Sequence, residues 1–178
     1  MKTNKTRNLL ARGFTLIEIL VVVVIVGGLI AFLANKFQQS QTGIAANEDN
    51  QLVTTIYTKM QSQRTNPGYG TLAYNSYLLT QSVWDPKRFT LATDAGVTTV
   101  TAQDAGTWTV TGNTANFTAT RTAYPAGACV SLLTGLSPQQ YVSVTIGTTT
   151  TNTPVNGSAA TTQCGTTGTV TVVLNSVG

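Results

Sequence analysis

Residues 14–34 read FTLIEILVVVVIVGGLIAFLA, and this stretch decides the first part of the fold. Its 21 residues include a single charged side chain, Glu18. As an α-helix the stretch would be about 30 Å long, which is the thickness of the hydrocarbon core of a bilayer. The sequence therefore predicts a helix suited to apolar surroundings, either a membrane or the core of an assembly.

The net charge of the chain is concentrated before this stretch. Residues 14–178 hold equal numbers of basic and acidic side chains, so the formal charge of +4 belongs to the N-terminal tail. A basic tail stays on the cytoplasmic side of a membrane, and a neutral remainder argues against a nucleic-acid-binding face. A cleaved secretory signal fits less well, because Phe32 stands where cleavage after Ala34 requires a small residue. The basic residues of the tail are Lys2, Lys5, Arg7 and Arg12.

The overall composition points away from a cytosolic enzyme. Of 178 residues, 42% are hydrophobic and only 9% are charged, whereas ordinary soluble domains have about 25% charged residues. The chain contains no histidine, which removes the usual general base and the commonest zinc ligand. This composition favours an exported or assembled surface protein.

The segment Arg12–Glu18, RGFTLIE, resembles the signature of type IV prepilins: a basic leader, a glycine, an aromatic residue and TLIE. In that family, which includes the pseudopilins of type II secretion, a membrane peptidase cleaves after the glycine and methylates the new N-terminus. The resemblance implies cleavage between Gly13 and Phe14, so that residues 1–13 are a leader peptide. The helix then holds the protein in the inner membrane until the subunit enters a helical homopolymer at the cell surface.

Glu18 has a physical role that can be argued from its position. An acidic side chain in hydrocarbon costs roughly 2.5 kcal/mol or more unless a partner compensates it. Cleavage after Gly13 would create that partner, the amine of Phe14, about one helical turn away. In a filament of the family's type, Glu18 would meet the amine of a neighbouring subunit and set its axial register. The alternative is a carboxylate near the headgroups that reaches water.

Two consecutive glycines, Gly27 and Gly28, interrupt the apolar stretch. Each costs about 1 kcal/mol relative to alanine inside a helix. They could allow close helix packing, give the helix a point of flexibility, or be tolerated without a purpose.

Beyond Ala34 the pattern becomes amphipathic. Apolar residues recur at steps of three, four and seven, and no proline occurs before Pro67, which predicts that the helix continues to about Arg64. The second half would then pack on a C-terminal head formed by residues 65–178. The recurring apolar residues are Phe37, Ile44, Ala45, Leu52, Val53, Ile56, Tyr57 and Met60.

The C-terminal segment predicts an antiparallel sheet and hence an α+β fold. Valine, threonine and aromatic residues are concentrated in five segments typical of strands, with Gly112-Asn113 as a hairpin turn and Ala128–Leu136 as a short helix. Thr148–Thr167 is predicted to be an exposed loop. Three large aromatic residues, Trp84, Trp108 and Phe117, are assigned to the core, with stacking on a sugar as the alternative. The predicted strands are Val97–Thr101, Thr107–Thr111, Asn116–Thr122, Tyr141–Ile146 and Thr169–Leu174.

The chain has two cysteines, Cys129 and Cys164, and two cysteines in an exported domain usually form a disulfide. Such a bond would stabilise the head by roughly 4 kcal/mol in the chain-entropy treatment. A disulfide-closed C-terminal region is also what the resemblance to type IV pilins implies. The place of Cys129 at a short helix resembles the IVb and conjugative thin-pilus branch, whereas the leader length and Phe14 are more usual in the IVa branch.

No constellation of residues predicts catalysis, a cofactor or a metal. Glu48 and Asp49 are adjacent and are expected to point to different sides of a helix. Asp85, Asp94 and Asp104 are expected to be turn formers, with a calcium site as the alternative. No phosphate-binding loop occurs.

The sequence thus predicts a structural subunit of a bacterial type IV pilus and not an enzyme. Its partners would be other copies of itself, the prepilin peptidase, the assembly machinery and the inner membrane. A type II secretion pseudopilin and a membrane-anchored adhesin that does not polymerise are the alternatives. The task of the fibre is left open among adhesion, motility and DNA transfer or uptake.

Processing gives a direct test. Replacing Gly13 by a bulky residue, as in Gly13→Leu, should leave the leader attached, because the peptidase must fit the residue before the cut. Intact mass of the purified chain measures the outcome. A wild-type mature chain that begins at a residue other than Phe14 would contradict the assignment.

Overall fold

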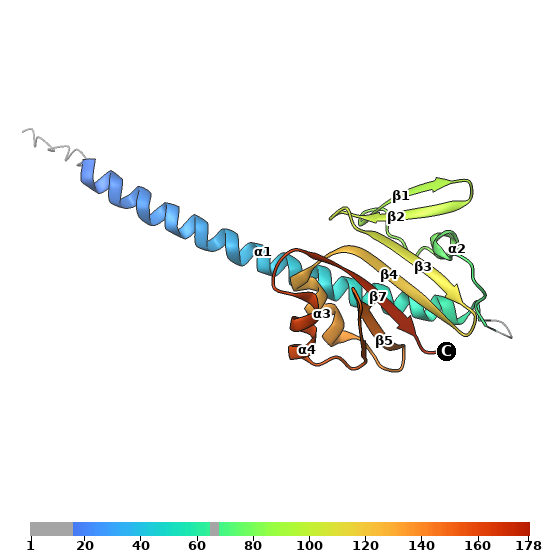
Figure 1. The fold of residues 1–178 in the computed structure, drawn as a ribbon. Helices are drawn as coiled ribbons and strands as arrows, with labels where there is room; N and C mark the ends of the chain where they lie inside the picture. The colour runs from blue at the N-terminus through green and yellow to red at the C-terminus, as the bar shows by residue number, and fades with distance from the viewer. Residues whose placement is uncertain (1–15, 65–67) are drawn as a thin grey trace, which may run out of the picture. The chain divides into compact units, whose positions relative to one another are not determined.

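The computed structural model describes residues 16–64 and 68–178, which belong to two compact units, residues 1–40 and 41–178. Helix α1 (Leu16–Gln61) has 46 residues and runs from the first unit into the second. Among the residues that the structure describes, none of the helices is long and apolar enough to cross a membrane. The second unit is called the head from here on; unlike the head expected from the sequence, it includes the last part of α1, which lies along a sheet (Figure 1).

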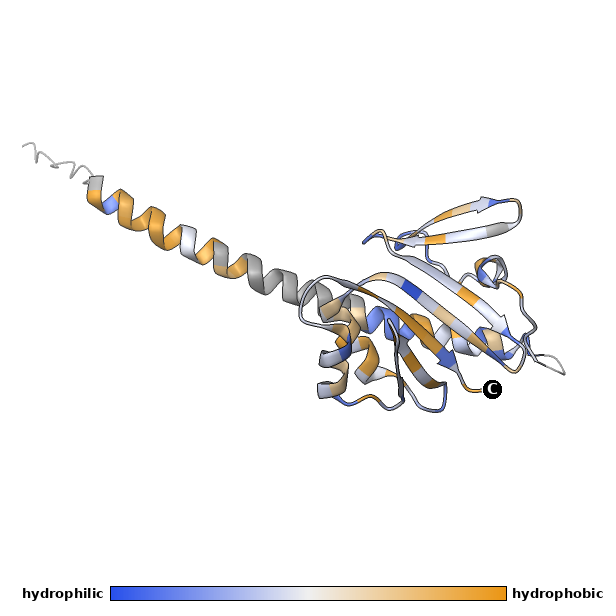
Figure 2. Cartoon of the chain, viewed as in Figure 1, coloured by the Kyte–Doolittle hydropathy of each residue, from blue (hydrophilic) through white to orange (hydrophobic). Residues whose placement is uncertain are grey.

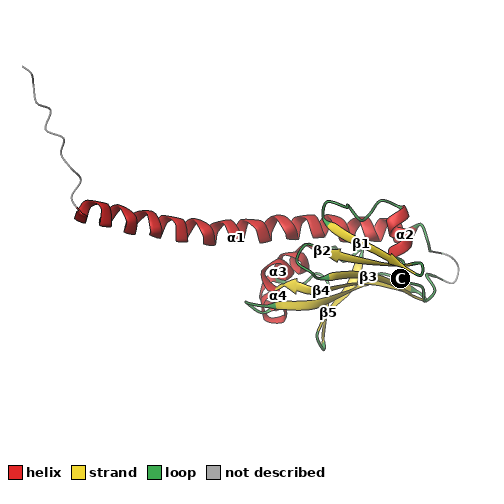
Figure 3. Ribbon diagram, turned by 90° about the horizontal axis from the view of Figure 1, so that it is seen from above, coloured by secondary structure: helices red, strands yellow, loops and turns green. Residues whose placement is uncertain are grey.

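Seven antiparallel strands form the sheet of the head, in the order β1-β2-β3-β4-β7-β5-β6. Figure 3 shows the strands of this sheet in yellow, with β1 to β5 labelled. Each of the five predicted strands is present, and the bounds of β5 agree with the prediction to the residue. The strands are β1 (Phe89–Asp94), β2 (Val97–Ala102), β3 (Thr107–Asn113), β4 (Asn116–Pro125), β5 (Tyr141–Ile146), β6 (Thr149–Asn152) and β7 (Thr169–Ser176). The shorter helices are α2 (Asn75–Thr80), α3 (Ala126–Gly135) and α4 (Gly157–Cys164).

The last part of α1 packs on the sheet through a stripe with helical spacing. Val53, Ile56 and Met60 are fully buried in the core of the head, as the period of 3.6 residues requires for one face of a helix. The hydroxyl of Tyr141 on β5 donates to the carbonyl of Val53 over 2.7 Å and fixes the helix against the sheet. The amphipathic helix predicted from the sequence is therefore confirmed, although α1 ends at Gln61 and not at Arg64.

Alternation along the strands gives the sheet two chemically different faces. On β3, Trp108 and Val110 are buried, whereas Thr107, Thr109 and Thr111 lie on the other face and keep some exposure. The same alternation on β4 buries Phe117 and Arg121, so the inner face is mostly apolar and the outer face carries threonine hydroxyls. Trp84, Trp108 and Phe117 are core residues, as predicted.

The predicted turn at Gly112-Asn113 is wrong. Both residues are paired within the β3–β4 hairpin, and the turn falls on Thr114 and Ala115. Gly112 is needed for a different reason: a Cβ there would lie 2.7 Å from the carbonyl oxygen of Gly70. The segment from Gly70 to Ala73 approaches β3 closely and forms bridges to Thr114 and Thr111.

The predicted exposed loop over Thr148–Thr167 is also wrong, because it contains β6 and α4. The side chain of Asn156 accepts a hydrogen bond from the backbone N–H of Ala159 over 2.8 Å and caps α4, as asparagine commonly does at helix starts. Val155 and Ala160 are buried and connect this segment to the core.

The disulfide between Cys129 and Cys164 is present. It joins α3 to α4, and both cysteines are buried. The short helix predicted at Ala128–Leu136 is confirmed as α3, which begins two residues earlier.

Helix α2 and strand β1 are absent from the sequence prediction. Asn75, at the start of α2, is buried and places its amide between β2 and β3. Its Nδ2 donates to the carbonyls of Thr98 (3.1 Å) and Trp108 (2.8 Å), and its Oδ1 accepts from the N–H of Val110 (3.0 Å). This side chain substitutes for backbone pairing where β2 and β3 separate, because their register covers only Val100↔Trp108 and Thr101↔Thr107.

Asn75→Ala should lower the free energy of unfolding by about 3 kcal/mol, since it leaves one buried donor and two buried acceptors without partners. Asn152→Ala is the matched control, because its exposed side chain makes no hydrogen bond within the described residues, and it should cost under about 0.5 kcal/mol. Urea denaturation followed by fluorescence of the buried Trp84, whose Nε1 donates to the Asn75 carbonyl, measures both. Equal costs for the two variants would refute the role given to Asn75.

Candidate assembly site and its anchoring in the head

The first part of α1 presents apolar side chains to its surroundings all round the helix. Most of its Ile, Val and Leu side chains are half exposed or more, with Ile17 at 71% and Ile30 at 63%. Figure 2 shows this run of hydrophobic residues along the start of α1. Water-exposed apolar surface of this extent marks a site that another molecule covers. We call the exposed apolar residues of α1 between Ile17 and Leu33 the candidate assembly surface.

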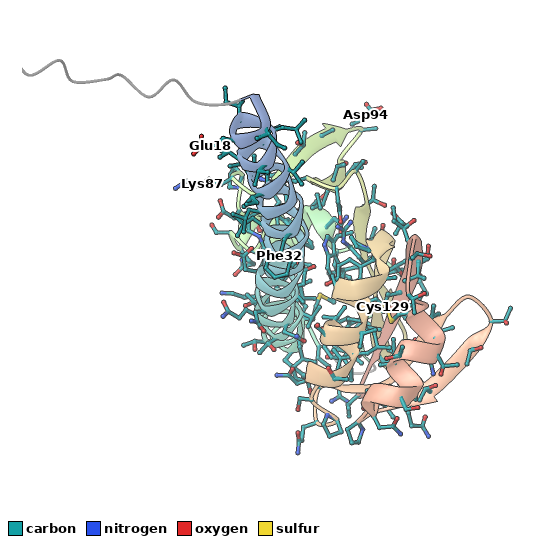
Figure 4. The ribbon with its side chains drawn as sticks, turned by 90° about the vertical axis from the view of Figure 1, so that its left-hand side faces the viewer. Glu18, Phe32, Lys87, Asp94 and Cys129 are labelled. Carbon is teal, nitrogen blue, oxygen red and sulfur yellow. A yellow bond between two sulfur atoms is a disulfide. The ribbon has the colours of Figure 1, made fainter. Side chains whose placement is uncertain are left out.

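Glu18 lies in the first turn of α1 and its side chain is exposed, pointing away from the helix (Figure 4). It makes no ion pair with any residue in 16–64 or 68–178. Gly13 and Phe14, the predicted cleavage site and the predicted partner of Glu18, lie outside the described residues.

Gly27 and Gly28 are both helical, and a Cβ added at either would meet no atom within 4 Å. The space beside them is open within the described chain, so the structure gives neither glycine an internal packing role. Both glycines lie on the candidate assembly surface, where small residues would allow another helix to approach closely.

An arginine anchors α1 in the head. Arg88, which precedes β1, places Nε 3.0 Å from Glu48 Oε2 and Nη2 3.0 Å from Asp49 Oδ1. The sequence predicted that these adjacent carboxylates point to different sides of the helix. Asp49 is buried and Glu48 is exposed, which agrees with that prediction, and the broad guanidinium nevertheless reaches both carboxylates.

Asp49 is the buried member of this group, with 6% of its surface exposed. Burial raises the pKa of Asp49 above its ordinary value of 3.8, while the Tyr124 hydroxyl and the Arg88 guanidinium act in the opposite direction. Burial and the Asp49 carboxylate in turn raise the pKa of Tyr124, so this hydroxyl keeps its proton. Tyr124 and the arginines thus favour the charged form of a carboxylate that burial disfavours.

A second arginine is buried on the inner face of the sheet. Arg121 on β4 pairs with Asp104 over 2.5 Å, and its guanidinium lies 5.6 Å from the ring of Trp108 and 5.4 Å from that of Tyr124. The ion pair compensates the burial of this cation, and the aromatic rings add cation–π attraction. Sequence reasoning missed both arginines, and the only signal for Arg121 was a lone charge within a strand of alternating threonine.

The loop aspartates have local roles. The side chain of Asp85 accepts from the backbone N–H of Lys87 over 2.9 Å, which is the behaviour predicted for a turn former. Asp104 combines a similar bond from Gly106 with its ion pair to Arg121. Within 16–64 and 68–178, no three residues of the types His, Cys, Asp and Glu lie together as a metal site would require.

The family model described as PilS N terminal matches residues 44–177, which is most of the chain. The chain belongs to the PilS family. A crystal structure of a type IVb pilin from Salmonella typhi matches this PilS-family chain with a TM-score of 0.58 and 25% identity, over 74% of this chain and 97% of that one. No curated protein matches it.

These likenesses identify a type IV pilin of the b branch, and hence a subunit of a pilus. The branch agrees with the expectation drawn from the place of Cys129. Members of this family with this fold are structural subunits, in keeping with the absence of a predicted catalytic group.

Arg88→Met should lower the free energy of unfolding by about 2 kcal/mol, because it leaves the buried Asp49 without its cation; the partial exposure of Arg88 keeps the cost below that of a fully buried pair. Lys87→Met is the matched control, since Lys87 is exposed and has no ion pair with the described part of the chain, and it should change stability by under about 0.5 kcal/mol. Adding Asp49→Asn to Arg88→Met should recover part of the loss. Denaturation midpoints at neutral pH measure all three variants.

Asp49 also predicts a pH dependence. Because its pKa is raised in the folded head, the folded chain binds a proton more readily than the unfolded chain does. The contribution of Asp49 to the free energy of unfolding is therefore largest below pH 3.8 and falls as the pH rises through the folded-state pKa. Subtracting the stability profile of Asp49→Asn from that of the wild type isolates this slope, and a slope of the opposite sign would contradict the assignment.

Proposed function

We propose that this pilin is made with a leader of residues 1–13, cut between Gly13 and Phe14, methylated on Phe14, and polymerised through the first part of α1. The observation that carries the proposal is the candidate assembly surface, which is apolar all round and holds one exposed acid in its first turn. A helix that is hydrophobic on every side is stable only when it is surrounded.

Before assembly, the surrounding medium would be the inner membrane. This stage rests on the sequence of residues 14–34, with its single charge and its basic flank. The flank would remain in the cytoplasm, and the head, which contains the disulfide, would lie in the oxidising periplasm. After assembly, the head would be on the surface of the pilus.

In the filament, the surrounding medium would be the same helix from other subunits. Close packing of these helices excludes water, so a carboxylate among them needs a cation. The amine exposed by cleavage at Phe14 lies about one turn from Glu18 in the sequence and is repeated in every subunit. An incoming subunit would gain this ion pair only at one axial position, which would fix the register of the polymer.

Glu18→Gln separates insertion from assembly. The variant should enter the membrane and be cleaved normally, because removing a charge lowers the insertion cost and the leader is unchanged. The amount of subunit in sheared fibres should fall at least tenfold relative to the amount in the membrane, since a lost buried ion pair is worth more than one decade in an equilibrium constant. Quantitative immunoblots of both fractions give this ratio.

Asp94→Asn is the control for the lost negative charge. Asp94 is exposed at the tip of the β1–β2 hairpin, far along the chain from α1, and this change should leave the fibre yield unchanged. Normal fibre yield from Glu18→Gln would refute the pairing and leave Glu18 as a solvated carboxylate.

A further inference from the structure

The head contains a cavity of about 180 Å³ at the point where β2 separates from β3. Of the described residues that line it, none carries a charge, and most bear hydroxyl or amide groups. The polar lining residues are Asn75, Ser76, Thr98, Thr99, Thr107 and Thr109.

The part of the cavity that is lined by α2 is rigid. Both N–H groups and the oxygen of the Asn75 amide take part in its three hydrogen bonds to β2 and β3. Ser76 Oγ donates to the carbonyl of Gly96 over 2.8 Å and accepts from the N–H of Thr98 over 3.2 Å. These bonds hold α2 against both strands, so the cavity is formed before any ligand arrives, which limits the entropy lost on binding.

Two exposed threonines on the strands also line the cavity. Thr99 on β2 and Thr109 on β3 are exposed, and their hydroxyls make no hydrogen bond to another described residue. A threonine hydroxyl is one donor and two acceptors. Both strands therefore contribute to the cavity a hydroxyl group that can donate a hydrogen bond to a ligand or accept one from it.

Size and chemistry select the class of ligand. A cavity of about 150 Å³ is known to hold a benzene molecule, so this one has room for a single six-membered ring. An apolar ring would leave the hydroxyls of Thr99 and Thr109 unused, whereas the other lining hydroxyls already have partners in the chain. A charged ring would find no counter-charge among the lining residues.

We propose that this cavity binds a neutral pyranose, as the terminal sugar of a glycan would present it. Trp108 lines the cavity but is only 1% exposed, so no aromatic face is available for stacking and a single site is weak, on the order of 1 mM. The repetition of the site along a filament would supply avidity. Only the avidity rests on the proposed function, because each cavity lies within one chain and is present before any filament forms.

The test uses the full chain in a detergent without a sugar headgroup. Saturation-transfer NMR with methyl β-D-galactopyranoside, methyl α-D-mannopyranoside and methyl N-acetyl-β-D-glucosaminide should detect at least one neutral ligand. The double variant Thr99→Val/Thr109→Val, which keeps β-branched residues in both strands, should bind it about five- to tenfold more weakly. Thr171→Val, an exposed threonine on β7 outside the cavity, should bind as the wild type does.

Three outcomes would overturn the proposal: no binding of any neutral glycoside, unchanged binding in a double variant that melts at the wild-type temperature, or stronger binding of N-acetylneuraminic acid or of a peptide. Fibre yield of the double variant distinguishes this failure from failure of the assembly proposal. It should equal the wild-type yield whether or not the cavity binds sugar, whereas Glu18→Gln alters fibres and leaves sugar binding intact.

Discussion

The burial of one stripe of α1 beneath the sheet is the contact on which the head depends. Val53, Ile56 and Met60 are fully enclosed, and truncating a buried aliphatic side chain of this size typically costs about 2–5 kcal/mol. A domain has only about 5–15 kcal/mol of net stability, so this stripe accounts for much of what keeps the sheet in place. The same helix continues into the candidate assembly surface, which means that one element serves both the core of the head and the proposed polymer.

The head contains few charged residues, and its described ion pairs are formed by two arginines. Arg88 spans two carboxylates on α1, and Arg121 combines an ion pair with two aromatic rings. Such groups add little net stability over apolar residues of the same size, but they accept only one arrangement of their partners. Arg88 therefore fixes where α1 lies relative to β1, and Arg121 fixes the loop after β2 relative to β4, while the apolar stripe supplies the free energy.

Much of the fold could be predicted from the sequence where the signal was local. The period of apolar residues gave α1, and alternating valine and threonine gave five of the seven strands. The elements that were missed are fixed by distant contacts: α2 has no side-chain cap and is held by the amide of Asn75 between two strands, and α4 was obscured by threonine-rich composition. The turn was predicted at the wrong place because Gly112 suggests a turn in the sequence. In the structure a side chain at this position is excluded by the backbone of residues 70–73, which are far away along the chain.

The candidate site was predictable to the same degree and for the same reason. The apolar stretch and Glu18 are contiguous in the sequence, so their chemistry could be read without a structure. The pairing of Arg88 with Glu48 and Asp49, and the cavity between β2 and β3, join residues that are tens of positions apart. No local sequence pattern predicts these contacts, because they depend on how the sheet packs on α1.

The order of the strands has a consequence for a protein proposed to exist as many copies in contact. The described sheet ends in β1 and β6, and a free strand edge invites hydrogen bonding to the edge of another molecule. Here β6 has only four residues, none of them apolar, and β1 begins just after the cations of Lys87 and Arg88 and ends at Asp94. Short length and flanking charge are the means by which natural sheets resist amyloid-like stacking, so crowded subunits would stay individually folded.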